Sequence, residues 1–133
     1  MKTIVIDACA LIAYIKREKG ASLVETVFRN TENSLVIHAV NFYEVYYDLL
    51  RNGHLSADFL YELVKRLNIR VYEGLEHRIV SEGAKLKICY SMSLADSIAC
   101  GLTLKLDAAL LTADRHEFAE IAREKLVKIK FIR

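Results

Sequence analysis

Residues 3–14 read TIVIDACALIAY, and this stretch decides how the chain folds. The run 4–6 (IVI) is short, apolar and β-branched, which is typical of a strand buried on both faces. From residue 8 to residue 16 the apolar side chains recur on one side without Gly or Pro, which predicts a helix. Asp7 therefore stands where a buried strand gives way to a helix. In an open α/β sheet this is the edge where ligand sites collect.

Asp7 by itself also has an ordinary structural explanation. A carboxylate at the start of a helix accepts hydrogen bonds from the free backbone N–H groups of the first turn, and its charge suits the helix dipole. The case for a functional role depends on three further carboxylates that occur at similar positions in the chain.

Length and composition bound the class of protein. A chain of 133 residues, 53% of them hydrophobic, with a mean hydropathy of +0.19, is expected to fold as one domain spanning residues 1–133. No apolar run approaches the roughly 18–20 residues that cross a bilayer, and no secretory signal is evident, so we expect a cytoplasmic protein with no membrane association. The net charge of +2 is too balanced to indicate nucleic-acid binding by itself.

The cysteines argue against a structural zinc site. There are three, Cys9, Cys89 and Cys100, and none forms a C-x-x-C pair. Cys9 and Cys100 lie in apolar helical patterns, which predicts that they are small core residues.

The rest of the chain alternates between helical and extended patterns. Predicted helices cover residues 8–16, 21–29, 41–51, 56–67 (with Ser56 as N-cap), 74–90, 93–106 and 114–125, and predicted strands cover 4–6, 35–37, 69–72, 109–112 and 127–132. This alternation predicts an α/β fold, in which helices cover both faces of a mostly parallel sheet of about five strands. Apolar residues alternate with lysines in the last strand, which indicates an edge strand with one solvent-exposed face.

The three further acids are Glu44, Asp96 and Asp114, each near the start of a predicted helix. Each has a capping explanation: Asn41 as N-cap with Glu44 reaching back, Ser93 with Asp96 in the first turn, and Asp114 as N-cap with Glu117 three residues on. Glu44 and Asp114 follow strands that should run parallel to the first one, so they lie at the same edge as Asp7. Asp96 precedes a strand, and a long preceding helix would return the chain to that edge. Asp48, one turn after Glu44, is either a supporting acid or a solvated charge.

Four carboxylates in one cleft repel one another, and crowding them costs several kcal/mol unless a partner neutralises the charge. A divalent cation is the natural partner, and oxygen-only ligation suits Mg²⁺ or Mn²⁺ better than Zn²⁺. Such a cation lowers the pKa of bound water and stabilises charge on a phosphoryl group. This chemistry is typical of phosphodiester hydrolysis.

The ordered motifs resemble those of PIN-domain ribonucleases across essentially the whole chain. They are IVIDA (4–8) with LIAY (11–14), the helix that carries Asn41 and Glu44, LADSIA (94–99) and LLTAD (110–114). The chain is most similar to the VapC-type toxins of prokaryotic toxin–antitoxin pairs. The resemblance implies a three-layer α/β/α sandwich that binds one or two Mg²⁺ or Mn²⁺ ions. It also implies that Asp7, Glu44 and Asp96 are the core metal ligands.

The same resemblance implies roles for two further residues. Asp114 would be the fourth acid, which holds a second metal ion or the attacking water, and Thr112 would supply a supporting hydroxyl. It further implies an RNA substrate (often structured tRNA or rRNA), a homodimer and a small antitoxin partner. Cys9 departs from the pattern, because many relatives carry Ser, Thr or Asn there, and its presence would loosen the site without abolishing it.

The resulting hypothesis is metal-dependent endonucleolytic cleavage of RNA, with two alternatives left open. A phosphatase that uses Asp7 as nucleophile is disfavoured, because its usual Asp-x-Asp pattern would need an acid where Cys9 stands. A catalytically inactive PIN-like module that binds RNA or protein is disfavoured because a binding module has no reason to crowd four carboxylates.

Other residues near these motifs have two interpretations each. Arg115, Lys85 and Lys87 would contact phosphates or simply face solvent, and His116 is a poor candidate for a general base beside an activated water. The tyrosines of the third helix (Tyr43, Tyr46 and Tyr47) either line a partner groove or belong to the core.

Overall fold

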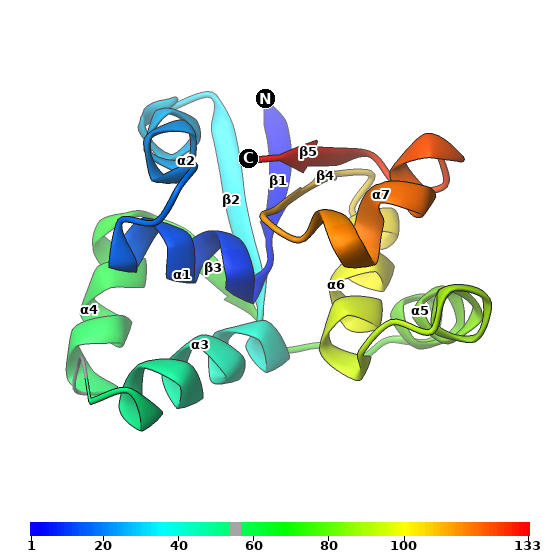
Figure 1. Cartoon of the computed structure of the whole chain (residues 1–133), viewed down its shortest axis with the longest axis horizontal. Helices are drawn as coiled ribbons and strands as arrows, with labels where there is room; N and C mark the ends of the chain where they lie inside the picture. Colours follow the sequence, from blue (N-terminus) through cyan, green and yellow to red (C-terminus); the bar gives the residue numbers. More distant parts are fainter. Residues whose placement is uncertain (54–56) are drawn as a thin grey trace.

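The computed structural model describes residues 1–53 and 57–133 (Figure 1). The strands are β1 (Lys2–Ile6), β2 (Asn33–His38), β3 (Ile69–Tyr72), β4 (Ala109–Thr112) and β5 (Ile129–Phe131). The helices are α1 (Ala8–Lys16), α2 (Ala21–Arg29), α3 (Ala39–Arg51), α4 (Ala57–Arg66), α5 (His77–Tyr90), α6 (Leu94–Lys105) and α7 (Arg115–Arg123). The predicted N-cap Ser56 lies outside the described residues.

The strands form one sheet in the order β3-β2-β1-β4-β5, and every neighbouring pair is parallel. This confirms the predicted parallel sheet and places β5 at an edge. Parallel strands end at the same edge of a sheet, so the carboxyl ends of β1, β2 and β4 lie side by side. The sheet therefore brings the residues that follow these strands together.

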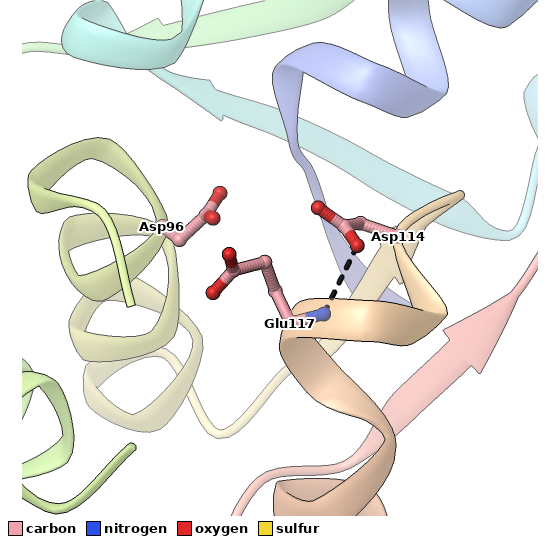
Figure 2. Close-up of side chains that lie close together, drawn as sticks. All are labelled: Asp96, Asp114 and Glu117. Carbon is pink, nitrogen blue, oxygen red and sulfur yellow. Dashed lines mark hydrogen bonds between the residues drawn. The ribbon is translucent and has the colours of Figure 1, made fainter. Parts of the chain in front are cut away.

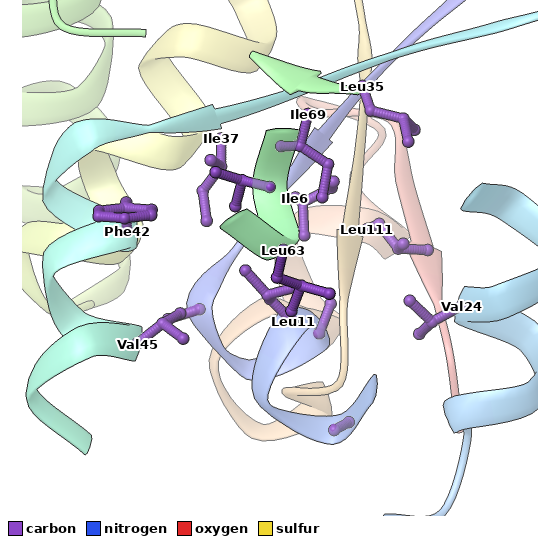
Figure 3. Close-up of a cluster of buried hydrophobic side chains, with 14 of the residues drawn as sticks. Ile6, Leu11, Val24, Leu35, Ile37, Phe42, Val45, Leu63, Ile69 and Leu111 are labelled. Atoms are coloured by element: carbon purple, nitrogen blue, oxygen red, sulfur yellow. The ribbon is translucent and has the colours of Figure 1, made fainter. Parts of the chain in front are cut away.

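The β1 strand is buried on both faces, as its run of β-branched residues predicts. Ile4 and Ile6 belong to one hydrophobic cluster, to which α1 to α4 contribute, whereas Val5 belongs to a second cluster with α5 to α7. Figure 3 shows the first cluster, where side chains of the sheet such as Ile6 and Leu111 face side chains of the surrounding helices such as Leu11. Helices thus cover both faces of the sheet, and the fold is a three-layer α/β/α sandwich.

Two predicted helix starts are wrong. The helix α3 begins at Ala39, because His38 rather than Asn41 caps it: the His38 Nδ1 accepts from the Val40 N–H at 3.0 Å. The His38 Nε2–H donates to the Gly74 carbonyl oxygen at 2.8 Å, which ties this cap to a loop that follows β3. The helix expected from residue 74 begins only at His77, after an extended residue at Glu76.

The helices α5 and α6 approach closely through two glycines. A Cβ atom on Gly83 would lie 2.6 Å from the Ser97 carbonyl oxygen, and one on Gly101 would overlap the Ile79 carbonyl oxygen. Backbone atoms cannot move aside as a flexible side chain does, so both positions require glycine. This contact fixes the position of α6, which carries Asp96. No helix in the described part of the chain is both long and apolar enough to cross a membrane.

We expect Gly101→Ala to lower the free energy of unfolding by about 1–3 kcal/mol, because the added methyl group forces α5 and α6 apart. Urea unfolding followed by circular dichroism measures the change. Ser22→Ala, on the exposed face of α2, is the control and should change stability by less than about 0.5 kcal/mol. Equal stability of the two variants would contradict the close packing.

Candidate active site at the carboxyl edge of the sheet

Asp7 follows β1 directly and caps α1. Its Oδ1 atom accepts a hydrogen bond from the Ala10 N–H at 2.9 Å, so the expected cap is present. The residue is 1% exposed, and its Oδ2 atom is buried without a hydrogen-bond partner. A cap needs only one of the two oxygens, so capping alone leaves the buried Oδ2 unexplained.

The buried Asp7 carboxyl is harder to ionise than an exposed carboxyl. Burial raises its pKa from 3.8 to about 7. The Thr112 hydroxyl and the Ala10 N–H oppose this rise, while the negative charges of Asp96 and Asp114 add to it. A positive charge placed here would therefore favour the ionised form of Asp7.

Asp96, Asp114 and Glu117 form a group of acids across the gap between α6 and α7 (Figure 2). One carboxylate oxygen from each lies within 4.8 Å of those of the other two, and all three residues are half-buried. The Ser93 hydroxyl accepts from the Asp96 N–H at 3.1 Å, and the Asp114 Oδ1 accepts from the Glu117 N–H at 3.0 Å. Both predicted caps are therefore present, and they hold the acids in place.

The pKa of the Asp96 carboxyl is also raised. Burial raises its pKa to about 6, the Ser93 hydroxyl opposes the rise, and the charges of Glu44, Glu117 and Asp114 add to it. Like charges at this spacing favour a bound cation or a retained proton.

Glu117 belongs to this acidic group, although its place in the sequence indicates only a capping role. The sequence places it three residues after Asp114, and its backbone N–H donates to the Asp114 Oδ1 atom, as the capping pattern predicts. Its carboxylate instead points across to Asp96 (Figure 2). The spacing from Asp114 is the signal in the sequence, but the direction of the side chain depends on α6, far away in the chain.

Glu44 lies on an exposed position of α3 and is not part of this group of three. Partial burial of its carboxyl and the charge of Asp48 raise its pKa. The charge of Glu44 in turn raises the pKa of Asp96. Asp48 is not simply solvated: the Lys16 Nζ lies 2.8 Å from its Oδ2 atom, which links α1 to α3.

Thr112 ends β4 and is fully buried. Its Oγ1 atom accepts from the Asp114 N–H at 3.0 Å, and the hydroxyl also lowers the pKa of Asp7. One hydroxyl thus contacts the backbone of one acid and favours the charged form of another.

The prediction for Cys9 is wrong, whereas that for Cys100 is confirmed. Cys100 is buried, but Cys9 is exposed at the start of α1. Desolvation around the sulfur and the charges of the four predicted acids raise the pKa of the Cys9 thiol to about 12. The raised pKa favours the protonated thiol.

The basic side chains near the motifs have structural contacts. The Arg115 Nε–H donates to the Arg133 carbonyl oxygen at 2.7 Å, and the Lys87 Nζ donates to the Met92 carbonyl oxygen at 2.7 Å. The Lys85 Nζ lies 3.9 Å from a Glu82 carboxylate oxygen. His116 is exposed on the first turn of α7.

The tyrosines of α3 do not all belong to the core. Tyr43 is 68% exposed and Tyr47 is 53% exposed, whereas Tyr46 packs against the first hydrophobic cluster. A groove of about 430 Å³ is lined by Ala39, Phe42, Tyr43, Tyr46, Tyr61, Val71 and Glu73.

The residues present fit a hard divalent cation. The donors are carboxylate oxygens. Those of Asp96, Asp114 and Glu117 lie within 4.8 Å of one another, and the negative charges of Asp96 and Asp114 also raise the pKa of Asp7, whose buried Oδ2 atom has no hydrogen-bond partner. Oxygen donors suit Mg²⁺ or Mn²⁺, whereas Zn²⁺ prefers thiolate and imidazole ligands.

Fold and site together define a class: a parallel α/β/α domain that gathers carboxylates at the carboxyl edge of its sheet. The family model for the PIN domain matches residues 4–124, and the chain belongs to the PIN-domain family. A comparison with curated protein sequences finds no match.

Solved structures with the same fold include several toxin–antitoxin complexes. A toxin–antitoxin complex from Klebsiella pneumoniae contains a chain with a TM-score of 0.72 and 15% identity, with 98% of both chains covered. For VapBC-1 from nontypeable Haemophilus influenzae the TM-score is 0.68 and the sequence identity is 18%, again with 98% of both chains covered. For DNA-bound VapBC from Salmonella typhimurium the TM-score is 0.70 and the sequence identity is 13%, with 100% of both chains covered. At these identities the likeness establishes the fold.

Proposed function

We propose that this chain is a Mg²⁺- or Mn²⁺-dependent endoribonuclease that hydrolyses RNA phosphodiester bonds. The observation that carries the proposal is the group of carboxylates at the sheet edge, with the buried Asp7 Oδ2 left without a partner. Membership of the PIN-domain family supports it. RNA cleavage by the purified protein with Mg²⁺ or Mn²⁺, and its loss with a chelator, tests it.

The proposed ligands are Asp7, Glu44, Asp96 and Asp114, to which Glu117 is added from the geometry. These residues would hold the cation, which would supply Lewis-acid chemistry and lower the pKa of bound water. The Thr112 hydroxyl accepts a hydrogen bond from the Asp114 N–H, which helps to position Asp114. The same hydroxyl favours the charged form of Asp7. Crowded carboxylates with raised pKa values support an ion-binding site over an inactive binding module.

We expect Glu117→Gln to weaken Mn²⁺ binding about 10-fold or more and to lower RNA cleavage by a similar factor, because one charge of the acidic group is lost. Calorimetry with Mn²⁺ and a cleavage assay measure the two effects. Glu120→Gln, one turn later and exposed on α7, is the matched control. Indistinguishable behaviour of the two variants would remove Glu117 from the site.

We further propose that the protein is the toxin of a toxin–antitoxin pair in the cytoplasm. The complexes named above support an antitoxin partner, because their chains share this fold. The test is co-expression with the product of the adjacent open reading frame. A stable complex that no longer cleaves RNA would support the toxin–antitoxin pair. The proposed homodimer is a separate point, and light scattering on the free protein tests it.

A further inference from the structure

Asn41 lies in the first turn of α3 and is fully buried. It does not cap α3, since His38 has that role. Its Nδ2 group donates to the carbonyl oxygen of Ala95 at 3.4 Å, across 54 residues of sequence. Ala95 immediately precedes Asp96, and Glu44 follows Asn41 by one helical turn. This amide therefore joins the two segments that carry Glu44 and Asp96.

The other end of the same amide has no partner. The Asn41 Oδ1 atom is buried without a hydrogen bond. An uncompensated buried acceptor is costly, and such atoms are rare in folded proteins. A bound water or ion is one physical explanation of such an acceptor. The contact of its Nδ2 group with Ala95 does not involve this oxygen.

A second orphaned oxygen occurs at the same edge of the sheet. Among the side chains that the structure describes, the buried oxygens with neither a hydrogen bond nor an ion pair are Asn41 Oδ1 and Asp7 Oδ2. Asp7 follows β1 and Asn41 follows β2, and these strands are parallel neighbours in the sheet. Buried acceptors of this kind are the groups to which ordered buried waters bond.

We propose that Asn41 is a positioning residue of the acidic site: its Nδ2 ties α3 to the first turn of α6, and its Oδ1 accepts a hydrogen bond from a water held among the carboxylates. The first contact keeps Glu44 beside Asp96. The second orients a water that would otherwise be free to rotate. Because this inference rests on the proposed cation site, it is tested by binding as well as by cleavage.

The experiment is calorimetric titration of Mn²⁺ into metal-free Asn41→Ala and wild-type protein. Loss of a polar group that supports metal ligands typically costs 10- to 100-fold in affinity, and we expect a loss in this range. Asn41→Ser keeps a shorter polar group and should bind Mn²⁺ with an affinity between those of the other two. Cleavage rates at saturating Mn²⁺ then show whether Asn41 acts on catalysis beyond binding.

Asn33→Ala is the matched control. Asn33 also donates its Nδ2–H to a backbone carbonyl oxygen, that of Val27 at 3.0 Å, but it begins β2 at the opposite end of the sheet. Its loss should leave Mn²⁺ affinity within twofold of wild type. If Asn41 had a purely structural role, Asn41→Ala would likewise leave the Mn²⁺ affinity within twofold of wild type.

Two outcomes would overturn the inference. Folded Asn41→Ala with wild-type Mn²⁺ affinity would make Asn41 a packing residue only. If that variant does not fold, wild-type affinity in Asn41→Ser would lead to the same conclusion. Failure of the proposed function is distinguishable, because the wild-type protein itself would then bind no Mn²⁺ or cleave no RNA.

Discussion

Asp96→Asn is expected to reduce RNA cleavage by at least about 10²–10³-fold. The substitution removes one negative charge from the group that would balance a divalent cation, and the remaining carboxylates cannot replace it. The fold should persist, because the Ser93 cap bonds to the backbone N–H of residue 96 rather than to its side chain. The loss is therefore expected in activity and not in stability.

Cleavage of total cellular RNA with Mg²⁺ or Mn²⁺ measures this effect, with a chelator as a second control. Asp58→Asn, on an exposed position of α4, makes the same chemical change away from the site and should retain full activity. Equal cleavage by wild type and Asp96→Asn, prepared identically, would mean a contaminating nuclease or the wrong residue.

Asp7→Asn should stabilise the metal-free protein at alkaline pH while it removes activity. The pKa of Asp7 is about 7 in the folded protein, against an ordinary value of 3.8. The folded state therefore binds more protons than the unfolded state, and the stability of the wild type falls as pH rises from about 4 to about 7. Asparagine cannot ionise, and its oxygen can still accept from the Ala10 N–H. We expect a gain of about 2–4 kcal/mol above pH 7.

Urea unfolding in the presence of chelator, at pH 4 and pH 8, measures this difference. The two proteins should have similar stability at pH 4 and diverge at pH 8. Added Mn²⁺ should reverse the order by stabilising only the wild type, because a ligand that binds the folded state raises the free energy of unfolding. A constant difference between wild type and Asp7→Asn across this pH range would show that Asp7 is already charged at pH 4.

Local features of the sequence account for most of the fold. The β-branched run 4–6 predicts a strand buried on both faces, and its residues divide between the two hydrophobic clusters. Asp7, Asp96 and Asp114 each occur beside a predicted helix start, and the expected capping bonds are present. Caps and strand patterns depend on near neighbours in the chain, which explains why they are predictable.

Features that depend on distant segments could not be predicted in this way. Asn41 has the ideal residue type for an N-cap, yet it contacts Ala95 of another helix while His38 caps α3. Glu117 resembles one half of a capping pair, yet its carboxylate faces Asp96. Cys9 lies in an apolar pattern, yet the edge of the sheet leaves it exposed. In each case the tertiary fold decides which way a side chain points.

The central claim is that the acids at the carboxyl edge of the sheet hold a divalent cation. The most direct test is anomalous diffraction from crystals of the protein soaked in Mn²⁺. We expect a strong peak bounded by the carboxylates of Asp7, Asp96 and Asp114. Mn²⁺ peaks only at other places on the molecule, with these carboxylates free of metal, would contradict it.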